Sequence, residues 1–224
     1  MTKRMILPLL FGLVGVMILV SLGTWQLRRL EWKEGVLAAI EVRIDARAEA
    51  LPDAPNEDAD QYLPVVVTGE VGEDFIRVLV SRKFHGAGYL IISPLNLGNR
   101  SVLLDRGFIK IDATVPEAPM GEVNITGNLL WPDDTNSSTP NPDMADRLWF
   151  SRDLAALSAE LGTEPVLVVA RETSFDDTPV SPLPVDTVGI PNDHLQYAIT
   201  WFSLAAVWLG MTMFLLWRIR QKTE

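Results

Sequence analysis

The sequence predicts a membrane protein in which two transmembrane helices flank a mostly antiparallel β domain, a barrel or a sandwich, outside the cytoplasm. Residues 5–25 and 195–217 contain no charged side chain. At about 1.5 Å per residue, each run is long enough to cross a hydrocarbon core of roughly 30 Å. Between them lie several short segments in which apolar and polar residues alternate, which is the pattern of half-buried strands.

The first apolar run is interpreted as a retained anchor rather than a cleaved signal peptide. It is longer than the apolar region of a signal peptide, which has about 7–15 residues, and its end at residues 21–25 lacks a small-residue cleavage site. No amphipathic segment rich in Arg and Ser precedes it. We therefore expect a bacterial inner (plasma) membrane rather than an organelle.

The charges beside the second apolar run predict that both chain ends lie in the cytoplasm. Arg218, Arg220 and Lys222 follow this run, whereas Asp186 and Asp193 precede it. Lys and Arg collect on the cytoplasmic side of membrane helices. The first run is ambiguous because basic residues lie on both sides of it. Since two spans place both ends on one side, we expect the central domain in the periplasm.

Composition excludes several classes of function. The chain carries a net charge of −10, and its middle is more acidic still because both ends are basic. This charge disfavours nucleic acid as a partner. The chain has no Cys and two His, so metal or cofactor chemistry would have to use His, Met, carboxylates or Tyr. No hydrolase, phosphate-loop or zinc-protease motif is present, and we expect no enzyme activity.

The central segment is expected to contain strands and two helices. A helix is expected from residue 28 to about 47, either continuing the first span or following a break near Trp25. Strands are predicted at 62–69, 75–83, 89–94, 101–111, 122–131, 148–150 and 166–170, and residues 51–61 are expected to form a loop. A short helix is predicted at 153–161, with Gly162 just past its end.

These patterns divide the chain into six expected segments. They are a cytoplasmic tail at 1–4, a transmembrane helix at 5–27, a juxtamembrane helix at 28–50, a periplasmic β domain with a Pro-rich return connector at 51–191, a second transmembrane helix at 192–217 and a cytoplasmic tail at 218–224.

The main candidate site residue is His194, at the start of the second apolar run. Tyr197, Ala198, Trp201 and Ala205 follow at spacings that place them near its face of a helix. An imidazole with flat aromatic and small neighbours could hold a planar macrocycle, with the imidazole as axial ligand of its iron. The alternative is an aromatic belt that anchors the helix at the membrane interface.

The first span carries matching features. Several glycines lie along one stripe, and glycine lets two membrane helices approach closely. Trp25 and Gln26 end this span at the depth where His194 begins the other. A pocket formed by Trp25, Gln26, His194 and Trp201 is therefore expected.

Two features of the central domain are weaker signals. His85 lies in a glycine-flanked turn, either as an exposed turn residue or as a contact for something docked at the barrel end. Arg106 and Gly107 interrupt an apolar strand, and a glycine inside a strand often marks a bulge. Arg106 is expected to organise hydrogen bonds rather than bind an anion.

Two long motifs resemble those of the Surf1 (Shy1) family. They are LGTWQLRRLEWK at residues 22–33 and NDHLQYAITWF at residues 192–202. Between them, GAGY at 86–89, LDRGF at 104–108 and WFSRD at 149–153 follow in the family's order. One motif departs from the family, because its usual NRGWVP is DRGFIK at residues 105–110.

This resemblance implies an assembly factor for haem–copper terminal oxidases that binds haem a, or another haem, and assists its insertion into or stabilisation in subunit I. His194 would be the axial ligand of the haem iron. The rest of the expected pocket, with Tyr197, would contact the haem. Expected partners are oxidase subunit I, haem a synthase, other assembly factors and membrane lipid. The alternative is a haem-free scaffold that holds oxidase subunits during assembly.

Overall fold

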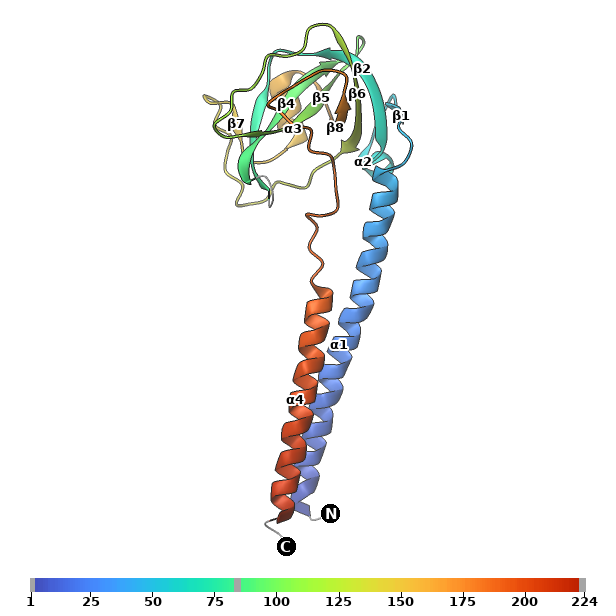
Figure 1. Cartoon of the computed structure of the whole chain (residues 1–224), viewed down its shortest axis with the longest axis vertical. Coiled ribbons are helices and arrows are strands. Elements are labelled where there is room, and N and C mark those ends of the chain that lie inside the picture. Colours follow the sequence, from blue (N-terminus) through green and yellow to red (C-terminus); the bar gives the residue numbers. More distant parts are fainter. Residues whose placement is uncertain (1–2, 83–85, 222–224) are drawn as a thin grey trace. The chain divides into compact units, whose positions relative to one another are not determined.

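Two long helices and a β-barrel domain make up the chain, whose computed structural model is shown in Figure 1. The structure describes residues 3–82 and 86–221. The chain divides into two units, one formed by Met1–Ala39 with Thr187–Glu224 and the other by Ile40–Asp186. His85 and Lys222, which entered the sequence predictions, lie outside the described residues.

Helices α1 (Lys3–Ile44) and α4 (His194–Gln221) are each long and apolar enough to cross a membrane. The mean hydropathy of their most apolar windows is 2.7 and 1.8. Of the two expectations for the segment after Trp25, continuation is confirmed, because α1 runs without a break to Ile44. This segment is rich in Leu, Ala, Glu and Arg and contains no proline, so its local preference is helical.

Helix α1 ends at Ile44, a few residues before the end predicted at about residue 47. The last carbonyls of a helix have no partner within the helix. Here the amide of Asn128 and the guanidinium of Arg171 donate to the Ile44 carbonyl, at 3.0 and 3.4 Å. Beyond this end, strand β1 (Glu49–Ala50) pairs with strand β2 (Pro64–Val71). Contacts with distant residues therefore set the end of the helix.

Five strands of the β domain close into a ring (Figure 1). They are β2 (Pro64–Val71), β4 (Gly86–Asn96), β5 (Ser101–Lys110), β6 (Glu122–Leu130) and β8 (Glu164–Thr173). Their order is β2–β6–β8–β5–β4, and β2 pairs again with β4 to complete the circle. All these pairings are antiparallel except β5–β8. Of the two predicted architectures, the barrel is the one observed.

Short elements extend this ring. Strand β3 (Ile76–Arg82) pairs with β4, and β7 (Leu148–Trp149) pairs with β3. Helix α3 (Leu154–Leu161) confirms the predicted short helix, with Gly162 just past its end in the left-handed conformation. Asp153, predicted as its first residue, is its N-cap. Helix α2 (Glu57–Asp60) falls within the segment expected to be a loop.

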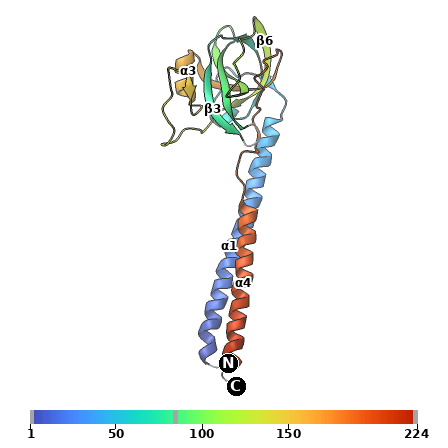
Figure 2. The ribbon, with the colours of Figure 1, turned by 60° about the vertical axis from the view of Figure 1, so that its left-hand side comes forward.

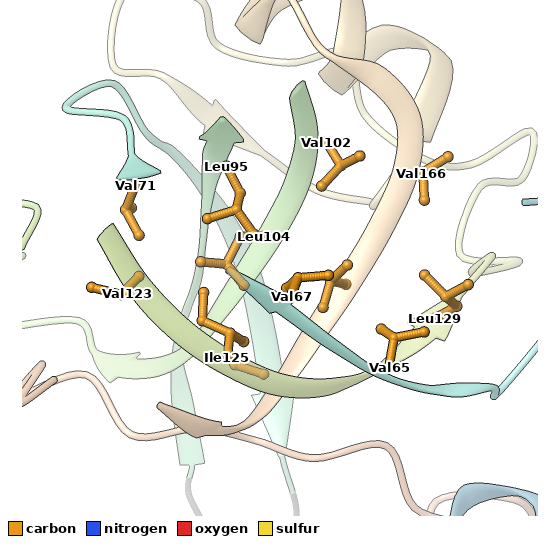
Figure 3. Packing of buried hydrophobic residues seen from close by; sticks show 12 residues of the cluster. Val65, Val67, Val71, Leu95, Val102, Leu104, Val123, Ile125, Leu129 and Val166 are labelled. Carbon is orange, nitrogen blue, oxygen red and sulfur yellow. The ribbon is translucent and has the colours of Figure 1, made fainter. Parts of the chain in front are cut away.

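The inside of the barrel is filled by apolar side chains from all five ring strands. Figure 3 shows them facing one another across the barrel. A second cluster lies on other faces of β4, β5 and β8, where Trp149 of β7 and Leu157 of α3 cover them. Strands β5 and β8 are therefore buried on both faces, which explains why they have continuous apolar runs rather than alternation.

Arg106 is the extra residue of a β-bulge. Ile91 pairs with Gly107 and Ile92 pairs with Asp105, so Arg106 has no opposite residue in β4. Its side chain is 1 % exposed. Its Nε donates to Asp177 at 2.9 Å, and its Nη2 donates both to Asp177 and to the Pro116 carbonyl. The expectation that Arg106 organises hydrogen bonds is confirmed.

The residue after the bulge has to be glycine. Gly107 has a φ of 130°, and a Cβ at this position would overlap the Ser181 backbone. The close approach lets Phe108 and Ser181 exchange two backbone hydrogen bonds, of 2.8 and 2.9 Å. The bulge therefore fixes the segment that leaves the barrel.

Replacing Asp177 with alanine is expected to lower the free energy of unfolding by about 3–5 kcal/mol, because the buried Arg106 would lose its charge partner. Denaturant unfolding of the full chain in detergent, followed by tryptophan fluorescence, measures the effect. Asp176→Ala is the matched control. Asp176 is exposed and accepts hydrogen bonds from the hydroxyl and N–H of Thr178, which lower the pKa of its carboxyl. Equal destabilisation by the two variants would contradict a stabilising role for the buried pair.

Candidate functional site

Helices α1 and α4 lie side by side in both views of the structure (Figures 1 and 2). Glycine makes this approach possible, because a Cβ on Gly12 would overlap Thr212 and one on Gly15 would overlap the indole of Trp208. The indole nitrogen of Trp208 donates to the Gly12 carbonyl at 3.2 Å. Small residues of this kind allow close packing between membrane helices.

The contact continues toward the start of α4. A Cβ on Gly23 would lie 2.8 Å from the ring of Phe202. Ala198 and Ala205 are the buried residues of α4, and they follow His194 by four and eleven positions. Their burial shows that the stripe containing His194 is the packed side of α4. The expected glycine contact between the two helices is present.

This packing brings His194 against Gln26. The Nδ1 atom of His194 lies 2.8 Å from the Oε1 atom of Gln26. Gln26 is 9 % exposed, and among the described side chains of α1 it is the only buried polar one. His194 is half-buried. Two of the residues predicted to share a pocket are therefore in direct contact.

The other predicted site residues have different surroundings. Trp25 is 55 % exposed and Tyr197 is 56 % exposed, whereas Trp201 is half-buried. An α-helix turns by about 100° per residue, so Tyr197 lies about 60° around α4 from His194 and Trp201 about 20°. Tyr197 is therefore at the margin of the packed stripe, and Trp201 is near its centre.

Asn192 is a residue that the sequence did not single out for this site. Its side-chain oxygen is buried and has no hydrogen-bond partner among residues 3–82 and 86–221. Buried acceptors usually have a partner, so this atom is a place where a ligand could donate a hydrogen bond. The signal in the sequence is its position two residues before His194, inside the second long motif.

The surface of the barrel domain contains pockets. One of about 500 Å³ is lined by Phe75, Arg77, Tyr89, Val115 and Arg147, among others. Asp74 is 2.8 Å from the guanidinium of Arg147 and raises its pKa. Within the described residues, no group of three or more His, Asp and Glu could hold a metal ion.

Known proteins resemble this chain over most of its length. The family model described as SURF1 family matches residues 13–206. Surfeit locus protein 1 of Rattus norvegicus is 32 % identical over 210 residues, which cover 83 % of this chain and 68 % of the rat protein.

Two further proteins are similar to this chain over most of its length. The SURF1-like protein of Drosophila melanogaster is 30 % identical over 212 residues, which cover 83 % of this chain and 70 % of the fly protein. Surfeit locus protein 1 of Homo sapiens is 29 % identical over 213 residues, with the same coverage of both chains. The region matched by the family model contains Gln26, the whole barrel and His194. The chain belongs to the SURF1 family.

Proposed function

We propose that this chain is a membrane-bound assembly factor for a haem–copper terminal oxidase, which binds haem a or another haem and assists its insertion into or stabilisation in subunit I. Family membership and the two terminal motifs support the oxidase part of the proposal. The contact between His194 and Gln26 is the observation that carries the haem part. The chain would act without catalysing a reaction of its own.

The residues around His194 fit a haem. Haem iron takes an axial imidazole, and one ring nitrogen of His194 is already held by Gln26. The other nitrogen, Nε2, makes no hydrogen bond to the described residues 3–82 and 86–221. Metal-bound histidines in proteins commonly have this arrangement, in which the second nitrogen is held by an oxygen.

The neighbouring side chains would form the rest of the site. A bound haem would supply an iron centre and a flat apolar ring. Trp25 is next to Gln26 in α1, and Tyr197 and Trp201 follow His194 in α4, so each helix offers aromatic side chains close in sequence to this contact. Trp25 and Tyr197 are exposed and therefore accessible to a ligand or a partner helix. His194 would hold the iron, and Gln26 would orient His194.

We also propose that both termini are cytoplasmic and that the barrel lies in the periplasm of a bacterial inner membrane. Arg218 and Arg220 in the last turn of α4, with Asp193 before its start, support this orientation. Helix α1 has 42 residues, or about 63 Å at about 1.5 Å per residue, so it is longer than a membrane span requires. Its charged second half would extend out of the membrane.

The second candidate function is a haem-free scaffold that holds oxidase subunits and other assembly factors, such as haem a synthase, together. The exposure of Trp25 and Tyr197 favours this function, because aromatic side chains at the interface anchor membrane helices. The two functions differ in whether His194 ligates iron.

His194→Ala is expected to change the absorption spectrum of the haem-loaded protein and to weaken haem retention, because the axial nitrogen is lost. The variant should remain in the membrane, since residue 194 is not needed for spanning. His85→Ala is the control and should leave the spectrum unchanged. The measurement is the spectrum and haem content of detergent-purified protein from cells that make haem a. Unchanged haem content and spectrum in His194→Ala would favour the scaffold.

Reporter fusions test the orientation. Alkaline phosphatase is expected to be active when fused after residue 120 and inactive at the C-terminus, because it folds only outside the cytoplasm. Met120 is fully exposed between β5 and β6, so a fusion there leaves the preceding strands intact. An inactive fusion at residue 120 that is present at a normal protein level would contradict this topology.

A further inference from the structure

The hydrogen bond between His194 and Gln26 has a defined donor and a defined acceptor. The Gln26 Oε1 atom is an amide carbonyl oxygen, which accepts hydrogen bonds and cannot donate them. Its distance of 2.8 Å from Nδ1 of His194 is that of an N–H···O hydrogen bond. With the amide oxygen at this position, Nδ1 carries the proton and donates it. A neutral imidazole has one ring proton, so Nε2 is left with its lone pair.

Because Gln26 is buried, its side-chain amide needs this hydrogen bond as well. Gln26 is 9 % exposed, and the other buried positions of α1 among residues 5–44 are glycine or apolar. An amide removed from water costs free energy unless it is hydrogen-bonded. The packed glycines on the same side of α1 leave Gln26 close to α4, where His194 is its hydrogen-bond partner. The geometry of the helix pair therefore favours one orientation of the imidazole.

We infer that Gln26 is a positioning residue that holds His194 in the tautomer protonated on Nδ1, so that Nε2 is the nitrogen available to a metal. The site is then prepared for a haem iron, or another iron that takes imidazole, before the ligand arrives. The inference rests on the proposed function only for the nature of this ligand. The tautomer itself is a property of the ligand-free chain.

Nitrogen NMR of the imidazole rings tests this directly. The full chain is labelled with ¹⁵N-histidine and purified in detergent without haem. Because the chain has two His, a His85→Ala sample identifies the signals of His194. We expect a protonated, pyrrole-type signal for Nδ1 and an unprotonated, pyridine-type signal for Nε2. A proton on Nε2 with none on Nδ1 would overturn the inference, since the Gln26 amide would then present its NH₂ group to Nδ1.

Substitutions of Gln26 separate positioning from packing. Gln26→Leu keeps the bulk and removes the acceptor, and the ratio of the Nδ1–H to the Nε2–H tautomer should fall about fivefold, the usual worth of one hydrogen bond. Gln26→Glu keeps an oxygen acceptor and should retain the proton on Nδ1. Gln196→Leu is the matched control, because Gln196 is exposed on α4 and its side chain is two positions from His194. An unchanged ratio in Gln26→Leu would overturn the inference.

A haemin titration of the same samples distinguishes this inference from the proposed function. Wild-type protein with the proton on Nδ1 that binds no haemin would support the positioning role and overturn the haem function. Wild-type protein that binds haemin through His194 but carries the proton on Nε2 when ligand-free would overturn the positioning role alone. If Gln26→Leu is not recovered from the membrane, the comparison of wild type with Gln26→Glu decides, because loss of the proton on Nδ1 in either one contradicts the inference.

Discussion

The close approach of α1 and α4 depends on glycine. Between apolar helices in lipid, the hydrophobic effect supplies little attraction, and packing of backbone against side chain takes its place. At Gly12 and Gly15 the side chains of Thr212 and Trp208 occupy the space that a Cβ would need. The polar groups at this contact are satisfied locally, since the Trp208 indole donates to Gly12 and the Thr212 hydroxyl donates to the Trp208 carbonyl. The packed stripe in turn sets where Gln26 and His194 meet.

A different constraint shapes the barrel domain. Closing five strands into a ring removes their open edges but leaves the entering and leaving segments to be fixed. The Ile44 carbonyl at the entry is held by Asn128 and Arg171, both from ring strands. The segment near Ser181 at the exit is held by the Arg106 bulge and its ion pair with Asp177. Buried polar groups thus fix both connections, while apolar side chains fill the inside.

The ring strands could be predicted because their residues show the burial pattern locally. Val65 and Val67 of β2 alternate with exposed neighbours, and Gly98 marks the turn between β4 and β5. Strand β1 and helix α2 were missed because two- and four-residue elements have almost no periodicity. The early end of α1 depends on side chains more than eighty residues away, so no local pattern indicates it.

The candidate site, too, could be predicted only in part from local sequence patterns. The histidine, the aromatic residues and the glycine stripe are visible in the sequence. Which side of α4 packs against α1 is a property of the helix pair, and it leaves Tyr197 exposed although it is three residues from His194. The hydrogen bond between Gln26 and His194 likewise follows from the rotation of two helices about their axes, which residue spacing alone does not specify.

Gln26 and His194 are 168 positions apart in the sequence, and all the strands of the barrel are encoded between them. During synthesis, the ribosome makes Gln26 early and has to complete every strand of the ring before it reaches His194. A chain whose synthesis stops at a residue within the barrel contains the glutamine and lacks the histidine. The pair therefore exists only in molecules whose β domain has been fully translated, and a ligand that needs both residues would bind only to such molecules.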